Sequence, residues 1–220
     1  MFNTRLDFMP MGRRSDHSRE EIREMALIVA ERIVRREGYA GLSARKVAKP
    51  MGYTVGTLYL VFKNLDDLIL HVNARTLDSL HATTTQAFEK TQDPQDRVIA
   101  IARAYIDFAA KNTHRWSMLF EHRQPQGEQR PPWYDEKVAR SLALVEKALT
   151  PLAQHRSANE IKQAARTLWG GVHGICILAL SQKLDTADAN SVRVLVESLV
   201  DNYLRGFTAA NVHAATPTNT

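Results

Sequence analysis

Apolar residues recur at intervals of three and four along most of this sequence, which is the spacing of a buried helical face. Between residues 18 and 37 one face carries seven of them: Ile22, Met25, Ala26, Val29, Ala30, Ile33 and Val34. Ser18 and Glu21 have the spacing of a capping box, and Gly38 suits the C-terminal stop. No segment alternates convincingly as a strand would, so we predict an all-α protein.

Start and stop signals divide the rest of the sequence into further helices. A short helix is predicted from Ser43 to about Lys49, and a second begins near Thr54, after a turn at Gly52. The Pro, Gln and Gly residues of 123–132 indicate a loop. A further short helix is predicted at residues 113–122, and longer helices are predicted at residues 64–90, 93–112, 133–149, 157–183 and 190–207. We therefore expect about nine helices.

Positive charge is concentrated in the first third of the chain. Residues 1–64 contain 12 Lys and Arg against 7 Asp and Glu, whereas residues 65–220 contain 17 of each. A basic module on a neutral body suggests a polyanionic partner for that module. On charge alone, a merely solvated basic helix explains the balance equally well.

The segment 43–64 has the spacing of two short helices that pack across a tight turn. Val47 and Met51 share one face of the first helix, and Leu58, Val61 and Phe62 share one face of the second. Both faces can pack on the helix of residues 18–37. This arrangement is typical of a DNA-binding helix-turn-helix.

The other face of the second helix carries small, hydroxylated or basic side chains. Tyr59 and Lys63 are one turn apart and can reach phosphates, although Tyr59 could instead be a half-buried packing residue. Gly56 costs about 1 kcal/mol relative to Ala, which close approach to DNA would offset. Arg13 and Arg14 are candidates for an arm in the minor groove. The candidate DNA-binding residues are Ser43, Ala44, Arg45, Lys46, Thr54, Val55, Gly56, Thr57, Tyr59 and Lys63.

The stretch from residue 18 to about residue 70 resembles the DNA-binding domain of the TetR family of repressors. The residues on which the resemblance rests are Gly38-Tyr39, Leu42-Ser43, Val47-Ala48, Met51-Gly52-Tyr53, Gly56-Thr57-Leu58-Tyr59, Phe62-Lys63-Asn64 and Leu68. Pro50, Val61 and Leu65 depart from the family's usual residues, and Leu65 replaces a frequent Lys, which removes one expected phosphate contact. The resemblance implies a dimeric, ligand-responsive repressor with a divergent helical C-terminal domain.

The C-terminal part resembles the WHG type of domain within this family, through Trp169 and His173-Gly174. The spacing of Trp169, His173 and Cys176 places them on one helical face, where aromatic residues of other helices can converge on an apolar ligand cavity. Packing in an ordinary core is the alternative for each residue, and it is the favoured one for His173. The candidate effector-binding residues are Phe108, Trp116, Phe120, Trp133, Trp169, His173 and Cys176.

The final helix has an apolar stripe that is wider than one core contact needs, so part of it should face a second copy. In the preceding helix, Gly170, Gly171 and Gly174 permit close helix approach. We predict a homodimer formed through residues 157–183 and 190–207. Its two helix-turn-helix units would read successive major grooves of a palindromic operator.

Other classes of function find little support in the sequence. We see no catalytic triad spacing, phosphate-binding Gly-rich loop or metalloprotease motif, and His173 and Cys176 have no further metal ligands at suitable spacing. We therefore expect no catalytic residue, metal or cofactor. A single cysteine and short apolar runs suggest a cytoplasmic protein without a membrane partner. A helical small-molecule-binding protein without a DNA function is the alternative.

These observations divide the chain into four parts. We assign residues 1–17 to a basic N-terminal extension, 18–64 to the helix-turn-helix DNA-binding domain, 65–207 to a helical-bundle effector-binding and dimerisation domain, and 208–220 to a tail. The predicted function is that of a sequence-specific DNA-binding transcriptional regulator, a repressor that a small-molecule effector releases from its double-stranded DNA operator.

Overall fold

The computed structural model describes residues 17–154, 156–185 and 188–209. Its helices are α1 (Arg19–Glu37), α2 (Ala44–Ala48), α3 (Val55–Leu58), α4 (Leu65–Lys90), α5 (Pro94–Lys111), α6 (Thr113–Glu121), α7 (Pro132–Leu149), α8 (Ala158–Leu180) and α9 (Ala189–Thr208), with 3-10 turns η1 (Tyr39–Gly41) and η2 (Thr150–Leu152). The described residues contain no strand, which confirms the predicted all-α fold. Arg13 and Arg14 lie outside the described residues.

The predicted helix signals act in the structure as expected at most ends. Ser18 with Glu21 forms a capping box at α1, and Ser157 with Glu160 forms another at α8. Asp93 caps α5, and Pro94 follows it at the first helical position. These contacts satisfy backbone N–H groups that the first turn of a helix leaves without a partner.

The C-terminal end of α8 differs from the prediction, because the helix ends at Leu180 rather than Lys183. Gln182 adopts a left-handed conformation with φ of 54°, and the Lys183 N–H donates to the Leu178 carbonyl at 2.9 Å. This is the geometry that closes helices when a glycine follows them. Gln182 occupies the position where a glycine usually ends a helix. The sequence therefore has no glycine there from which the end of α8 could be predicted.

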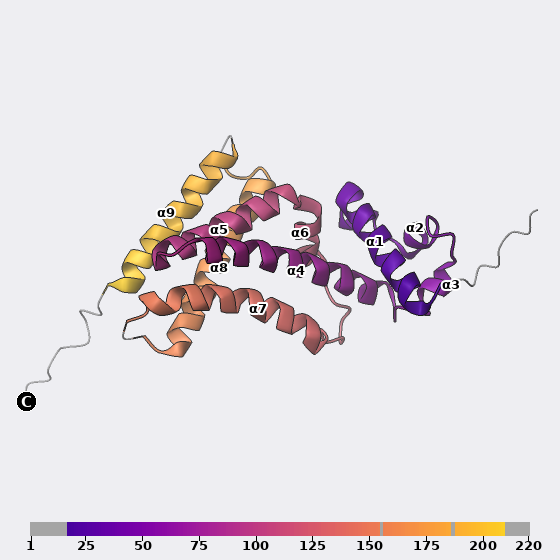
Figure 1. Ribbon diagram of the computed structural model, residues 1–220. Coiled ribbons are helices and arrows are strands. Elements are labelled where there is room, and N and C mark those ends of the chain that lie inside the picture. The colour runs from indigo at the N-terminus through magenta and orange to yellow at the C-terminus, as the bar shows by residue number, and fades with distance from the viewer. Residues whose placement is uncertain (1–16, 155, 186–187, 210–220) are drawn as a thin grey trace, which may run out of the picture.

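The two largest of three hydrophobic clusters among the described residues are joined by one long helix, α4. Figure 1 shows α1, α2 and α3 gathered at one end of the molecule and α9 at the other. The N-terminal core is built from α1, α2, α3 and the first turns of α4, and a larger core lies among α5, α7, α8 and α9. Leu68, Ile69 and Val72 of α4 belong to the N-terminal core, whereas Leu80 belongs to the larger one.

Helix α6 forms the second connection between the cores. Met118 is fully buried in the N-terminal core, and Trp116 is fully buried in the larger core. Two residues apart on a helix, these side chains point to nearly opposite sides. A short helix of nine residues therefore couples both parts of the protein.

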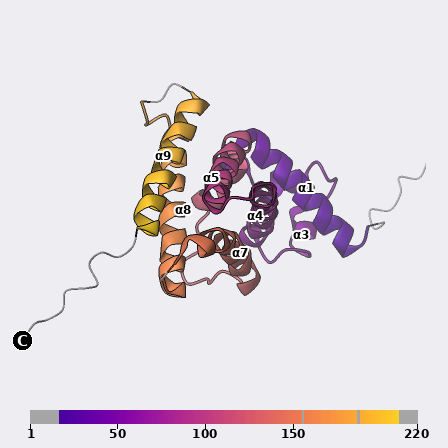
Figure 2. The same cartoon turned by 60° about the vertical axis from the view of Figure 1, so that its left-hand side comes forward.

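Helices α8 and α9 lie side by side on the side away from α1, as both views show (Figures 1 and 2). The two helices pack closely because Gly171 has no side chain: a Cβ there would lie 2.6 Å from Leu199 Cδ2 of the same chain. Gly170 and Gly174, in contrast, have open space where a Cβ would stand. Gly171 therefore allows α8 to pack against α9 of the same chain, whereas the sequence analysis expected it to allow close approach of a second copy.

Much of the apolar stripe on α9 faces the protein's own core. Val196, Val200, Leu204 and Phe207 are buried there. The exposed large apolar side chains of these two helices are Trp169, Ile177, Leu178, Val194 and Leu195. None of the described helices has the length and apolar character needed to cross a lipid bilayer.

Replacing Met118 tests the connection that α6 makes. Met118→Ala should lower the free energy of unfolding by about 2–5 kcal/mol, because it leaves a cavity inside the N-terminal core. The half-buried neighbour Ser117 supplies the control: Ser117→Ala should change stability by about 0.5 kcal/mol or less. Urea unfolding at one protein concentration measures both, and equal midpoints for the two variants would show that Met118 does not support this core.

Candidate DNA-binding surface and ligand cavity

The turn between α2 and α3 is built from local caps and one glycine. Ser43 Oγ accepts a hydrogen bond from the Lys46 N–H at 3.3 Å and begins α2. Gly52 makes the turn with φ of 73°, as the sequence predicts. Thr54 Oγ1 then accepts from the Thr57 N–H at 3.2 Å and begins α3. The two short helices are thus positioned by their own side chains and by the buried Val47 and Leu58.

The sequence pattern suggested a helix that continues to Lys63. In the structure, helix α3 is only one turn long and ends at Leu58. Beyond Leu58, two backbone hydrogen bonds join residues three apart instead of four. The Leu60 N–H donates to the Thr57 carbonyl, and the Val61 N–H donates to the Leu58 carbonyl, both at 3.2 Å. Leu58 and Phe62 are both almost fully buried, which anchors this irregular turn. As a result Leu60 is 63% exposed on the outer surface, a position that the sequence analysis did not select.

Six of the ten predicted DNA-binding residues are exposed, and they lie on α2, on α3 and in the turn that follows it: Arg45, Lys46, Thr54, Gly56, Tyr59 and Lys63. Tyr59 is 43% exposed, which argues against a purely packing role. Ser43, Val55 and Thr57 are half-buried. Ala44 is also half-buried and packs against the N-terminal core.

Two of the cations on this surface have carboxylate neighbours. Lys46 Nζ lies 2.6 Å from Glu37 Oε2, and this hydrogen bond holds the pKa of Glu37 below its usual value. Lys63 Nζ lies 3.6 Å from Glu128 Oε2, in the loop before α7. Both pairs are solvent-exposed, so they cost little to exchange for a phosphate.

A separate cavity of about 330 Å³ lies inside the C-terminal part. Its wall is formed mostly by apolar side chains of α4, α5, α7 and α8, including Leu80, Ile101, Leu142 and Leu168. The volume is at the lower end of the range of small-molecule sites in proteins. An apolar wall of this kind favours a ligand with a hydrocarbon or aromatic body.

Behind one side of the cavity lies a cluster of aromatic rings around His173. The His173 ring stacks on Trp169 with centroids 5.1 Å apart and contacts Phe120 at 4.2 Å. Its Nδ1 shares a hydrogen bond of 2.9 Å with Tyr105 Oη. Burial lowers the pKa of His173, so the ring is neutral at pH 7. This is the geometry of a hydrogen-bonded core histidine.

The seven predicted effector residues do not all lie at the cavity. Phe120 and Trp169 line the cavity. Phe108, Trp116 and His173 do not line it: Phe108 and Trp116 belong to the core, and His173 lies in the aromatic cluster. Cys176 borders a different hollow, between α5, α8 and the start of α9. Burial raises the pKa of its thiol to about 12, so the residue stays protonated and unreactive.

Trp133 lies away from the cavity, contrary to the prediction. Its ring stacks on His71 of α4 with centroids 4.7 Å apart, and Tyr134 lines the cavity instead. Successive residues of a helix point about 100° apart, so only one of the two can face inward. The sequence holds the missed signal, because Tyr134, Val138, Ser141 and Val145 recur at spacings of four, three and four and all line the cavity.

Family models match both parts of the chain. Residues 27–72 match the model described as bacterial regulatory proteins of the tetR family, and residues 98–203 match the one described as the tetracyclin repressor-like C-terminal domain. The chain belongs to the TetR family. The first match covers α2, the turn and α3, and the second covers most of the cavity wall.

Relatives and solved structures agree with this assignment. An HTH-type transcriptional regulator of Mycobacterium tuberculosis is 32% identical over 124 residues, which are 56% of this chain and 52% of that protein. The HTH-type transcriptional activator FasR of Mycolicibacterium smegmatis is 29% identical over 104 residues, 47% of this chain and 48% of that protein. The chain thus spans about half the length of these curated relatives.

The fold itself recurs in solved structures. A protein of unknown function from Rhodococcus sp. RHA1 superposes with a TM-score of 0.72 at 22% identity, over 90% of this chain and all of that one. The transcriptional regulator FadR of Bacillus subtilis, solved in complex with stearoyl-CoA, superposes with a TM-score of 0.63 at 16% identity, over 83% of this chain and 98% of that one.

Two glycines of this surface should respond differently to alanine. Gly52→Ala should destabilise the fold by about 1–2 kcal/mol, because its φ of 73° is strained for any residue with a Cβ. Gly56→Ala should leave stability unchanged or raise it by up to about 1 kcal/mol, since its Cβ would lie 3.6 Å from Thr54 Oγ1, an ordinary contact in a helix. Urea unfolding compares the two. A Gly52 variant as stable as the wild type would contradict the turn described above.

Proposed function

We propose that this protein is a sequence-specific DNA-binding transcriptional regulator that acts as a ligand-responsive repressor. The observation that carries the proposal is the path of α4, which packs in the N-terminal core at one end and lines the ligand cavity further along. The printed descriptions of its relatives as HTH-type transcriptional regulators support the DNA-binding role. FadR in complex with stearoyl-CoA supports the ligand-binding role.

The surface around α3 has the chemistry to read a major groove. Thr57 and Val55, early in α3, offer a hydroxyl and methyl groups to base edges and thymine methyls. Leu60, exposed beyond α3, adds a further apolar contact of this kind. Gly56 leaves the backbone open to close approach, with only Thr54 Oγ1 near its missing Cβ.

Phosphate contacts on both sides of α3 would position the protein on the duplex. Tyr59 and Lys63 follow α3, and Arg45 and Lys46 lie on α2, all with exposed side chains. Binding exchanges the contacts of Lys46 with Glu37 and of Lys63 with Glu128 for contacts with phosphates. Such contacts fix orientation and carry no sequence information by themselves.

The ligand acts through α4 and α6. From Val72, in the N-terminal core, to Leu80, in the cavity wall, is a distance of about 12 Å along α4. Leu119 and Phe120 of α6 also line the cavity, next to Met118 in the N-terminal core. A ligand that favours a different placement of these helices shifts the protein away from its DNA-bound arrangement. A coupling of about 1–3 kcal/mol is typical.

A homodimer places two copies of the surface on one operator. Exposed apolar side chains of α8 and α9, beside the open positions of Gly170 and Gly174, form a patch for a second copy: Ile177, Leu178, Val194 and Leu195. A two-fold axis through this patch gives an isologous four-helix interface. Two α3 helices about 34 Å apart then meet successive major grooves of a palindrome.

The alternative function is that of a helical small-molecule-binding protein without a role in DNA binding. The basic N-terminal third and the exposed surface at Thr54, Tyr59 and Lys63 favour the regulator. Selection of bound genomic fragments identifies the operator. A reporter gene placed behind that operator tests repression, and expression that rises with the protein would make it an activator.

Removing phosphate contacts should weaken binding to all DNA sequences while the fold survives. We expect Lys63→Ala to reduce the slope of log affinity against log salt by roughly one unit, because one fewer counterion is released. Tyr59→Phe should lower affinity on specific and random duplexes alike, because it loses a hydroxyl donor. Fluorescence anisotropy with a labelled duplex measures both at several salt concentrations.

Lys111→Ala is the matched control, since this exposed lysine ends α5, far from α3 along the chain and in the other domain. It removes the same charge and should leave the salt slope unchanged. Operator affinity that is unaltered in both the Tyr59 and the Lys63 variants would refute the phosphate assignment.

Charged substitutions on the exposed patch of α8 and α9 should break the dimer. We expect Leu178→Glu and Val194→Glu to sediment as monomers at micromolar concentration, because a buried unpaired carboxylate is costly. Ile28→Glu, on an exposed position of α1, should sediment like the wild type. A wild-type chain that is already a monomer of 24.8 kDa would exclude the palindromic mechanism.

A further inference from the structure

The cavity holds one charged residue in its wall, and that residue is a cation. Arg130, from the loop before α7, is the only Lys, Arg, Asp or Glu among the described residues that line it. The guanidinium lies 5.9 Å from the ring centroid of Tyr134, another wall residue, which holds it against the cavity. Its side chain is 51% exposed, so this part of the wall is open to solvent.

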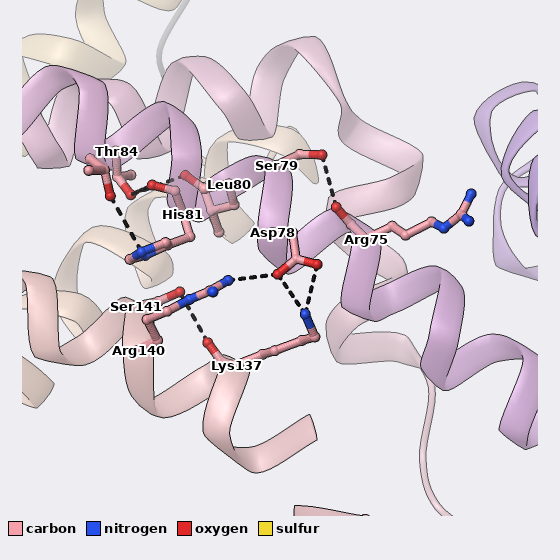
Figure 3. Close-up of polar contacts among 10 residues, drawn as sticks. Arg75, Asp78, Ser79, Leu80, His81, Thr84, Lys137, Arg140 and Ser141 are labelled. Atoms are coloured by element: carbon pink, nitrogen blue, oxygen red, sulfur yellow. Dashed lines mark hydrogen bonds and ion pairs between the residues drawn. The ribbon is translucent and has the colours of Figure 1, made fainter. Parts of the chain in front are cut away.

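Three hydroxyl groups of the wall, those of Thr84, Tyr105 and Ser141, are already engaged elsewhere. Figure 3 shows Thr84 and Ser141 on facing helices, with hydrogen bonds that return to their own helices. Thr84 Oγ1 donates to the carbonyls of Leu80 and His81, both at 3.0 Å, and Ser141 Oγ lies 3.5 Å from the Lys137 carbonyl. Tyr105 Oη is bonded to His173. The inner wall therefore offers few free donors to a polar ligand group.

The facing helices α4 and α7 are joined outside the cavity by ion pairs. Asp78 binds both Lys137 and Arg140, at 2.7 and 2.6 Å (Figure 3). Neither Lys137 nor Arg140 is a wall residue, and both have a carboxylate partner. They are thus not available to a ligand inside, and Arg130 remains the anchor for a charged group.

Arg130 has one carboxylate partner of its own among the described residues. Its Nε lies 3.0 Å from Asp135 Oδ1, and both side chains are about half exposed. An exposed pair of this kind contributes little stability and exchanges readily. The Asp135 contact uses Nε, while a guanidinium carries five N–H donors in all. The N–H groups on Nη1 and Nη2 can therefore bind a second anion at this part of the wall.

The size of the cavity limits the apolar part of the ligand. A methylene group needs about as much room as a water molecule, whose share of liquid volume is about 30 Å³. A cavity of about 330 Å³ therefore accommodates on the order of ten carbon atoms. Each buried methylene adds about 0.8 kcal/mol of transfer free energy, so affinity should rise with chain length until the cavity is full.

We propose that the effector is an anionic amphiphile, with a hydrocarbon body of about ten carbon atoms in the cavity and one anionic group on Arg130. This inference rests on the proposed function for the meaning of the cavity as an effector site. A carboxylate and a phosphate monoester share the required chemistry, because both accept paired hydrogen bonds from a guanidinium. A cationic or a neutral amphiphile of the same length has no comparable anchor.

Direct titration of the full chain, without DNA, tests the proposal by calorimetry. The probes are decanoate, decyl phosphate, decan-1-ol and decylamine, with hexanoate and octadecanoate for length. We expect decanoate or decyl phosphate to bind about tenfold more tightly than decan-1-ol, with decylamine weakest. The ratio of decanoate to decyl phosphate identifies the head group. Decanoate should also exceed hexanoate, and octadecanoate should gain nothing further. Equal affinities for the anion, the alcohol and the amine would overturn the proposal.

Three variants locate the anion. Arg130→Gln should abolish the preference for decanoate over decan-1-ol. Asp135→Asn should strengthen it, because the competing carboxylate is removed while the guanidinium stays. Arg123→Gln, in the same loop but outside the wall, should leave it unchanged. A preference that survives Arg130→Gln would place the anion elsewhere and overturn the assignment, whereas thermal unfolding confirms that each variant is folded.

The same probes added to the complex with operator DNA separate this inference from the proposed function. If decanoate binds through Arg130 but leaves DNA affinity unchanged, the ligand assignment stands and ligand-controlled repression fails. If the protein binds its operator but none of the amphiphiles binds the cavity, the ligand assignment fails and the DNA-binding role stands.

Discussion

The continuity of α4 is the constraint on which the rest of the structure depends. A helix of 26 residues with an unbroken hydrogen-bond ladder is stiff, and its two halves are buried in different cores. Leu68 and Val72 fix its N-terminal half, while Leu77 and Leu80 face the cavity. The N-terminal domain cannot turn independently of the cavity wall without bending α4 or opening a core. Met118 on α6 adds a second point of attachment, so the two parts are held at two places.

Polar contacts around these two attachments affect the relative orientation of the helices more than the stability of the fold. Arg75 on α4 binds Glu24 and Glu31 on α1, and His122, just after α6, lies 2.8 Å from Asp66 at the start of α4. The ion pairs of Arg75 are partly exposed and contribute little net stability. Apolar burial therefore provides the stability of the junction, and the ion pairs select one relative orientation of the helices. Such a junction favours discrete arrangements over gradual deformation.

The sequence predicts those features that depend on local chemistry. The helix-turn-helix follows from Gly52 and the caps at Ser43 and Thr54, and the starts of α1 and α8 follow from their capping boxes. Features that depend on contacts between helices are less accessible. Trp133 was assigned to the cavity because aromatic residues are common in ligand sites, but the rotation of α7 that turns it toward His71 is set by tertiary packing. Arg130 carries no periodic signal, because it lies in a loop.

Helix α3 is too short to be stable by itself, since an isolated helix of one turn does not form in water. Its conformation is imposed by Leu58 and Phe62, which are buried beneath it. The outward positions Gly56 and Leu60 contribute almost nothing to that anchoring, whereas Thr54 caps the helix. In evolutionary terms, this separates the residues that keep the fold from those that meet a partner. A lineage can therefore change the outer surface of α3 by single substitutions at Gly56 and Leu60 at little cost in stability, without compensating changes in the core.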